Sequence, residues 1–505
     1  MAASDEDLLL SLFESHIVSE DRQATKIVTT KEFGRVVVAT RDFPTIGDVI
    51  VRERPLLVWD NRDHGFACYL DAFLSASPEA QSLILDMHTP PTDSKYMANL
   101  RSTAVALCRQ LSNYNAQLGV DKVVQLIGVS NINAHEYYGR PAEAFHEVES
   151  TEARISSGKS ALFAYGSKIA HSCCPNATYT SKTLDGCLEY KVLAPIQEGD
   201  MITFAYIDNN PSVPTHLRRQ ELMDTKVFFC ECLLCTGMDY ARLHPCPTGA
   251  CPGKVSCVQP TENSNPQWSC TECGAVSDDI VRQLKQNELQ IQNKLSTLLM
   301  KARMSLSSVH PSIATALVEE ATRVLSNTHF LTLQVKSECS RLCASHAQGV
   351  SGAVQMGLLR ADSPTPYGSL VSLRLQSATF NLEFVRGCEC VAARCTLGPT
   401  CPSYKGNVDD FHVPVYTCNV NVFHSLMDLK DVPDSRWPEG SVSLLKRYVL
   451  LCYVQFGLED QDVQEMEAKL ATMSETKKKA TLAAAGRGGR TNKKKKGKKG
   501  RGKKK

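Results

Sequence analysis

Long apolar runs are missing from the sequence: no segment approaches the roughly 18 residues that a membrane-spanning helix needs. A basic leader is also missing, because the first residues are acidic, which does not fit a secretory signal peptide. These two absences predict an intracellular protein without a membrane partner. The chain has 505 residues, of which 43% are hydrophobic and 22% charged. This composition excludes wholesale disorder, and the length suggests about three domains.

Acidic residues are missing from 476–505, where the sequence holds 15 lysines and arginines. All 54 acids therefore lie in residues 1–475 with 41 bases, so an acidic body precedes a strongly basic tail. The low-complexity composition of the tail predicts disorder. Such a tail suits a nuclear-import signal, an anchor for nucleic acid or a nucleosome, or a solubilising segment without a partner. We expect nuclear and cytoplasmic localisation, and salt-sensitive binding wherever the tail contacts nucleic acid.

Hydrophobic periodicity divides the rest of the chain into strand-rich and helical parts. β-branched residues on both sides of the turn at 44–47 predict two strands within 34–58. Helical spacing covers 71–127, short strands alternate with turn residues over 160–240, and helices follow from 278 to about 460, including 280–306 and 312–325. The last region is compatible with paired helical repeats, but no repeat is regular enough to establish them.

Cysteine is abundant, with 21 residues, and clustered cysteines in an intracellular chain indicate metal binding in preference to disulfides. Cys230, Cys232 and Cys235 form C-x-C-x-x-C, a spacing that lets three thiolates face one zinc ion. Zinc prefers four tetrahedral ligands, so the fourth must come from elsewhere in the chain. The competing interpretation is a cysteine-rich buried strand, which the crowding of reduced thiols disfavours.

Two further cysteine groups follow. The first consists of two pairs flanked by turn residues, the outline of a small zinc ribbon: Cys246 and Cys251, then Cys270 and Cys273. Cys257 is not needed as a ligand in this interpretation. The alternative for the whole group is a surface loop of unligated thiols. The second group lies in a helical context and comprises Cys388, Cys390, Cys395 and Cys401. Neighbouring positions point to different faces of a helix, so we expect these four to be core residues.

Four segments, in order and followed by the cysteine triplet, resemble the motifs of a SET domain, specifically of the SET-and-MYND group of protein lysine methyltransferases. Residues 33–50 are similar to the opening hairpin, and 129–135 to the asparagine segment of the group. Ser167-Lys-Ile-Ala-His-Ser-Cys-Cys-Pro-Asn176 is similar to the N-H-S-C-x-P-N motif. Gly199-Asp-Met-Ile-Thr-Phe-Ala-Tyr-Ile-Asp208 is similar to G-E-x-I-x-x-x-Y-x-D. The resemblance covers about residues 30–275.

The resemblance implies an α+β fold with a SET β core and a zinc-bound post-SET region, followed by an all-α, TPR-like domain and the disordered tail. The expected divisions are the first part of the SET domain at 27–60, a helical insert at 61–128, the core SET domain at 129–210, the post-SET region at 211–277, the helical domain at 278–465 and the tail at 466–505. The MYND zinc module that gives the group part of its name should be absent, because the connection after residue 59 offers only His64 and Cys68 as zinc ligands.

The resemblance also implies the site residues. Cys173 becomes the fourth ligand of the first zinc, although spacing alone leaves its neighbour Cys174 as a rival. Tyr206 matches the catalytic tyrosine, which would orient a substrate lysine toward the methyl group of S-adenosylmethionine. The cofactor contacts carried over are Arg35, Asn133, Ser167, His171, Tyr206 and Phe228. The implied partner is a protein substrate that presents a lysine.

Three residues depart from the group's pattern. Ala170 stands where the group usually has asparagine, Val36 replaces the second glycine of a Gly-x-Gly, and Lys226 lies where many members place an aromatic residue. These departures support an alternative function, that of a catalytically weak SET scaffold that binds proteins or chromatin and regulates transcription.

Overall fold

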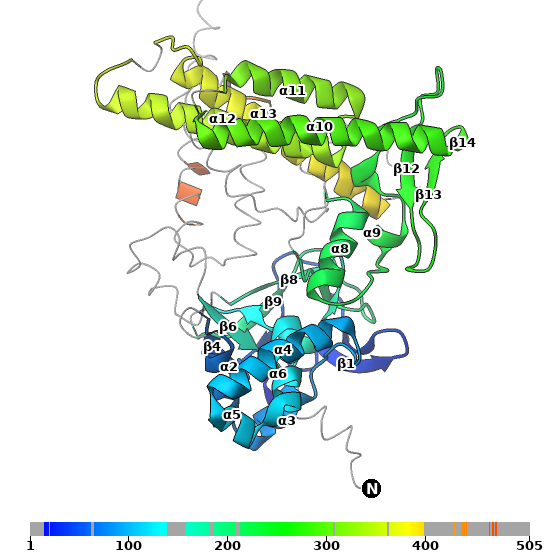
Figure 1. Ribbon diagram of the computed structural model, residues 1–505, viewed down its shortest axis with the longest axis vertical. Coiled ribbons are helices and arrows are strands. Elements are labelled where there is room, and N and C mark those ends of the chain that lie inside the picture. The colour runs from blue at the N-terminus through cyan, green and yellow to red at the C-terminus, as the bar shows by residue number, and fades with distance from the viewer. Residues whose placement is uncertain are drawn as a thin grey trace, which may run out of the picture.

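The computed structural model describes residues 15–19, 21–61, 65–138, 158–181, 183, 185–207, 213–306, 309–360 and 363–397, with a few positions between 429 and 471. A strand-rich part with a helical insert lies at one end, and a layer of long helices lies at the other (Figure 1). Within these described ranges, no helix combines the length and apolar character needed to cross a bilayer. The predicted basic tail lies outside them.

The strand-rich part is assembled from small sheets. β1 (Thr25–Thr30) and β2 (Gly34–Ala39) form an antiparallel hairpin, and Gly34 turns it with a φ of +66° that favours glycine. The three-stranded sheets have the orders β3-β9-β8 and β4-β6-β5. Their bounds are Val49–Glu53 for β3, Leu57–Asp60 for β4, His135–Glu136 for β5, Lys159–Leu162 for β6, Ala177–Thr180 for β8 and Leu188–Val192 for β9. A short parallel pair joins β7 (Ala170–His171) to β10 (Thr203–Phe204).

The pairing of these strands corrects one expectation. The turn at 44–47 predicted two strands of a hairpin, yet β2 and β3 belong to different sheets, and β4 is a further strand in the same stretch. β3 pairs instead with β9, more than a hundred residues later. The physical reason is burial: β-branched residues form strands locally, but the partner is chosen by the shared core, where Ile50 and Val51 are buried with Tyr190.

The helical insert packs against β4, whose Leu57 and Trp59 side chains belong to its core. Its helices are α2 (Phe66–Ser75), α3 (Pro78–Leu85), α4 (Lys95–Gln110), α5 (Ser112–Gln117) and α6 (Gly119–Asn133). Ser77 and Ser94 start α3 and α4 by accepting backbone N–H groups, which satisfies donors that a helix leaves free. Only residues 61–65 separate β4 from α2, which leaves no room for a cysteine- and histidine-rich zinc module.

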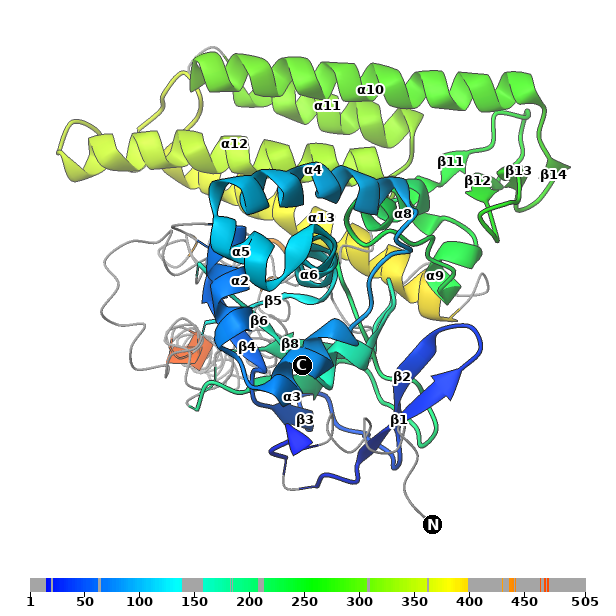
Figure 2. The same cartoon turned by 60° about the horizontal axis from the view of Figure 1, so that its bottom comes forward.

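A cysteine-rich region connects the two ends of the molecule. It contains α8 (Thr215–Thr225), the short α9 (Leu233–Thr236) and a four-stranded antiparallel ribbon in the order β11-β12-β13-β14. The ribbon strands are His244–Pro245, Lys254–Val258, Gln267–Cys270 and Gly274–Ala275. In Figure 2 this ribbon lies at the end of the helical layer, beside the start of α10.

The helical layer consists of α10 (Asp278–Met304), α11 (Pro311–Val324), α12 (Phe330–Gln355) and α13 (Leu370–Leu397). The first three run alongside one another, and α13 packs along α12 (Figure 2). Apolar residues of α10, α11 and α12 share one core, so the predicted helical region is present. Cys388 is buried in α13, as expected of a core cysteine, whereas the side chains of Cys390, Cys395 and Cys401 lie outside the described residues.

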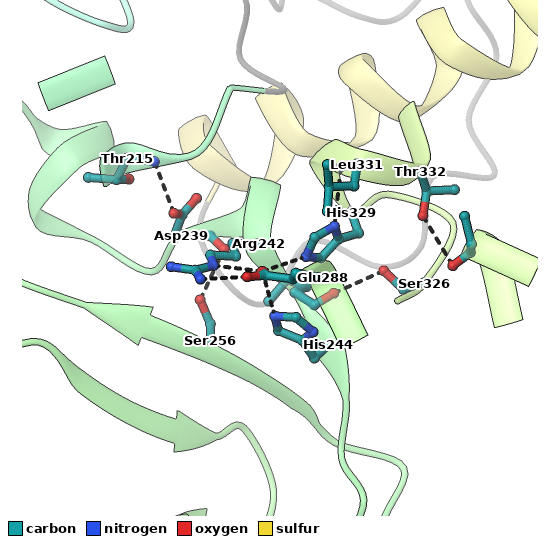
Figure 3. A network of polar contacts seen from close by, with 12 residues as sticks. Thr215, Asp239, Arg242, His244, Ser256, Glu288, Ser326, His329, Leu331 and Thr332 are labelled. Atoms are coloured by element: carbon teal, nitrogen blue, oxygen red, sulfur yellow. Dashed lines mark hydrogen bonds and ion pairs between the residues drawn. The ribbon is translucent and has the colours of Figure 1, made fainter. Parts of the chain in front are cut away.

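A buried charge network fastens the ribbon to this layer (Figure 3). The Glu288 carboxylate in α10 accepts two hydrogen bonds from Arg242, with Nε–Oε1 and Nη2–Oε2 distances of 2.7 and 2.6 Å. His244 and His329 each place Nε2 3.1 Å from the same Oε1 atom. Burial opposes ionisation of Glu288, but the hydrogen bonds from Arg242 and His329, with the His244 ring close by, outweigh it and lower the pKa of the carboxyl.

The network resembles a metal site in its distances but not in its protonation. His244, Glu288 and His329 place their ligand atoms within 4.8 Å of one another. However, Nδ1 of His329 accepts the backbone N–H of Leu331 at the start of α12. The ring proton therefore lies on Nε2, which donates to Glu288 and has no lone pair left for a metal ion. We therefore interpret the group as a hydrogen-bonded ion network.

Removing the Arg242 cation from this network should make the protein less stable to unfolding. We expect Arg242→Met to lower the free energy of unfolding by about 3–5 kcal/mol, because it leaves the Glu288 carboxylate buried without its ion pair. Arg282→Met is the matched control, because Arg282 pairs with Asp279 on the exposed surface and should contribute about 0–1 kcal/mol. Urea unfolding measures both variants, and equal effects would contradict the buried network.

Candidate functional site

Four cysteines meet where the strand-rich part contacts the cysteine-rich region. Cys173 follows β7, and Cys230, Cys232 and Cys235 lead into and through α9. Their sulfur atoms all lie within 4.8 Å of one another. The Sγ–Sγ distances from Cys173 are 3.6 Å to Cys235 and 3.9 Å to Cys230. Sulfur atoms that bind one zinc tetrahedrally at about 2.3 Å stand about 3.8 Å apart, so this cluster fits the ion.

The environment of this cluster also suits a metal-bound set of thiolates. Arg218 of α8 is almost completely buried, and its Nη2 atom lies 3.6 Å from Sγ of Cys235. Four thiolates around one zinc would leave two excess negative charges, one of which the guanidinium offsets. Arg219, the next residue, donates to the backbone carbonyl of Cys230 at 2.9 Å and stacks on Phe229. Two arginines of one helix therefore fix the turn that carries the cysteines.

The ribbon carries the second group of four cysteines, and their sulfur atoms again lie within 4.8 Å of one another. Sγ–Sγ distances are 3.6 Å between Cys246 and Cys273 and 3.7 Å between Cys251 and Cys270. A Cβ atom at Gly253 would stand 2.3 Å from Sγ of Cys270, so the close approach of chain and sulfur requires glycine there. This group also fits a tetrahedral zinc ion.

Metal analysis of variants tests whether Cys173 or its neighbour Cys174 is the fourth zinc ligand. We expect the purified chain to hold two zinc ions, Cys173→Ser to hold one, and Cys174→Ser to keep both, because only Cys173 lies with the cysteine triplet. Cys270→Ser should lose the other ion. Mass spectrometry of metal content after dialysis measures all four proteins. Loss of zinc from the Cys174 variant with retention in the Cys173 variant would reverse the assignment.

Tyr206 is connected to the first cysteine cluster through one histidine. The Tyr206 N–H donates to Nδ1 of His171 at 3.0 Å, and Nε2 of His171 lies 3.2 Å from Sγ of Cys173. Burial lowers the pKa of His171 to about 4, so the ring is neutral and its single proton lies on Nε2. The cysteine cluster therefore sets the position of the tyrosine backbone.

The tyrosine side chain belongs to a small aromatic group. Its hydroxyl donates to the carbonyl oxygen of Ile169 at 2.7 Å, and burial raises the pKa of Tyr206, which keeps the hydroxyl protonated. Ring centroids are 5.2 Å apart for His171 and Tyr206 and 5.8 Å apart for His171 and Phe228. All three residues are partly exposed.

Three other predicted cofactor residues contact different partners. Nη2 of Arg35 lies 2.5 Å from the Asp86 carboxylate. The amide of Asn133 donates to two backbone carbonyls, and the hydroxyl of Ser167 donates to the carbonyl of Ala164. The structure thus brings His171, Tyr206 and Phe228 together, while Arg35, Asn133 and Ser167 are held by neighbouring backbone and side chains.

Two buried ionisable residues near this site escaped the sequence analysis. Glu53 of β3 is fully buried, and it accepts the N–H groups of Tyr165 and Gly166 at 2.6 and 2.8 Å. Burial raises its pKa to about 8 despite these hydrogen bonds. Lys168 is also buried, with Nζ 3.7 Å from the Asp86 carboxylate, and burial lowers its pKa to about 8. Neither residue stands in a pattern that predicts burial, since Glu53 lies between two arginines and Lys168 is the only charged residue between 160 and 170.

Two of the three residues that depart from the group's pattern occupy regular strand positions in the structure. Val36 is buried in β2, where its side chain packs inside the protein, and Ala170 pairs with Thr203 between β7 and β10. The third departure differs, because Nζ of Lys226 lies 5.8 Å from the centroid of the Tyr206 ring. A cation therefore stands beside the aromatic group.

Comparison with known proteins agrees with this arrangement. Residues 34–207 match the family model of the SET domain. A SET and MYND domain-containing protein of Dictyostelium discoideum is 29% identical over 138 residues, which is 26% of this chain and 24% of that protein. The N-lysine methyltransferase SMYD2 of Rattus norvegicus and that of Mus musculus are each 40% identical over 81 residues, 16% of this chain and 18% of each relative.

The matched family model, together with the sheets and the segment that carries His171 and Tyr206, identifies residues 34–207 as a SET domain. Within that class, the chain is SMYD-like, as its similarity to the SET-and-MYND proteins shows. The matches span about a quarter or less of the length of these relatives.

Proposed function

We propose that this protein transfers a methyl group from S-adenosylmethionine to a lysine of a protein substrate. The observation that carries the proposal is the connected set of Cys173, His171, Tyr206 and Phe228, which places a protonated hydroxyl and two aromatic faces on one partly open wall. The names of the N-lysine methyltransferases that resemble the chain support the same reaction.

The residues of this wall suit the needs of methyl transfer. S-adenosylmethionine, when bound, would supply an electrophilic methyl group on a positively charged sulfur. Phe228 and His171 would hold the adenine by stacking, which contributes about 1–3 kcal/mol per base in comparable sites. The Tyr206 hydroxyl would orient the amine that attacks, and alignment of this kind can supply roughly 7–11 kcal/mol. The amine nitrogen gains the methyl carbon, the carbon–sulfur electrons stay on sulfur, and one amine proton leaves to water.

The zinc ions would have a structural role in this proposal. Both sets of four cysteines leave no position for a substrate on a tetrahedral ion, so neither ion would take part in the reaction. The first ion would hold Cys173 and thereby His171, which receives the backbone N–H of Tyr206. The second would close the ribbon.

A protein-binding scaffold is the second candidate, and Lys226 supports it. An ammonium beside Tyr206 opposes the approach of a protonated lysine side chain. In this function the aromatic wall would be present but would not catalyse methyl transfer. The basic tail would attach the protein to nucleic acid or nucleosomes in the nucleus, with some protein in the cytoplasm.

Deletion of 476–505 should then weaken DNA binding in a salt-dependent manner, whereas an unchanged affinity would exclude the tail as an anchor.

Cofactor binding distinguishes these two functions first. We expect calorimetry of the zinc-loaded chain to show one micromolar site for S-adenosylmethionine, and Phe228→Ala to weaken it by about 5- to 150-fold through lost stacking. Phe33→Ala, which removes an exposed phenylalanine of the β1–β2 turn, is the matched control. No binding by the folded, metal-loaded protein would exclude the methyltransferase.

Transfer itself depends on the hydroxyl of Tyr206. We expect Tyr206→Phe to bind S-adenosylmethionine about as tightly as the unchanged protein but to lose most methyl transfer, because the ring remains and only the orienting hydroxyl is removed. Incorporation of labelled methyl groups into lysine-containing proteins measures the effect. Full activity in this variant would remove Tyr206 from the mechanism.

A further inference from the structure

The backbone around Lys226 has an unusual conformation. Lys226 ends α8, and the N–H groups of Lys226 and Val227 both donate to the carbonyl of Leu222 at 2.8 Å. Val227 then adopts a φ of +61°, a left-handed conformation that a β-branched residue rarely takes. Such conformations persist only where the surroundings enforce them, and they gather at functional sites. This turn separates Lys226 from Phe228 of the aromatic wall.

The ammonium of Lys226 is fixed at the end of another helix. Nζ donates to the carbonyl of Ile132 at 2.9 Å and lies 3.3 Å from that of Asn131, both in the last turn of α6. Carbonyl groups at a helix C-terminus carry partial negative charge and favour a cation. Burial opposes the charge and lowers the pKa of Lys226, but the two acceptors stabilise the ammonium form. The side chain is therefore held in place rather than free in solvent.

This cation acts on the residues of the proposed transfer site. Nζ lies 5.8 Å from the centroid of the Tyr206 ring. Two other charges bear on the site: Arg218 faces the sulfur of Cys235, and Lys168 faces the carboxylate of Asp86. Each of these has an acidic neighbour, whereas among the described residues the hydrogen bonds of Lys226 go to the two backbone carbonyls.

We propose that Lys226 is a specificity-determining residue that disfavours positive charge at the reacting position beside Tyr206. This inference rests on the proposed methyl transfer. The methyl donor carries a positive sulfur, and its product S-adenosylhomocysteine differs by one methyl group and by the loss of that charge. A fixed ammonium within several ångströms therefore favours the neutral product over the donor, and it favours a methyl acceptor that arrives as a neutral amine in place of an ammonium.

The ratio of two dissociation constants tests this inference. Calorimetry with the full zinc-loaded chain would give the constants for S-adenosylmethionine and S-adenosylhomocysteine in the unchanged protein, Lys226→Met, Lys226→Arg and Lys122→Met. We expect the unchanged protein to bind the product about 10-fold more tightly than the donor. Lys226→Met should reduce this preference several-fold, mainly by tighter donor binding. Lys226→Arg should keep it, and so should Lys122→Met, which removes an exposed lysine from α6.

Each result has one meaning. An unchanged ratio in Lys226→Met, with both ligands bound, overturns the inference and leaves the proposed function intact. Equal loss of the preference in Lys226→Met and Lys226→Arg also overturns it, because shape and not charge would then be responsible. Absence of binding by either ligand to any of the folded proteins removes the proposed function, and the inference with it. Lys226→Gln supplies the same comparison if the methionine variant does not fold.

Discussion

The rest of the site depends on the contact between Cys173 and the C-x-C-x-x-C segment. Cys173 lies in the strand-rich part, and its sulfur stands 3.6 to 3.9 Å from those of Cys235 and Cys230, about sixty positions later. Two residues before it, His171 connects this cluster to the backbone of Tyr206. A tetrahedral ion at this point would cross-link two distant segments, so the position of the tyrosine depends on contacts between those segments and not on local sequence alone.

A small number of buried ionisable side chains performs the same task at other junctions. Glu53 holds the turn before the His171 segment through two backbone N–H groups, and Glu288 of α10 holds the segment that leads into the ribbon through Arg242. Buried polar groups of this kind are costly unless they are paired or hydrogen-bonded. Where they occur they determine how two elements meet, because any other arrangement would leave a polar group without a partner. Lys226 follows this rule at the end of α6.

Local features of the chain were predictable. The helices expected at 280–306 and 312–325 occur as α10 and α11, displaced by two residues or fewer, because apolar spacing and the breaks at their ends are local signals. The cysteine spacing likewise identified the triplet of the first group and the four cysteines of the ribbon, whereas Cys173 was implied only by the resemblance. The pairing of β2 and β3 was wrong, since a strand-forming segment does not carry the identity of its partner. Cys173 and Cys174 were equivalent in spacing and became distinct only in the fold.

The sequence by itself determined the types of element, the cysteine groups and the SET-like order of motifs, because each depends on residues that are close in the chain. Tertiary structure alone decided that Lys226 stands beside Tyr206, that His329 donates to Glu288, and that β3 pairs with β9. These contacts join segments from different parts of the chain. Which of the compatible partners meet is settled by packing around a common core, where burial and hydrogen bonding must be satisfied together.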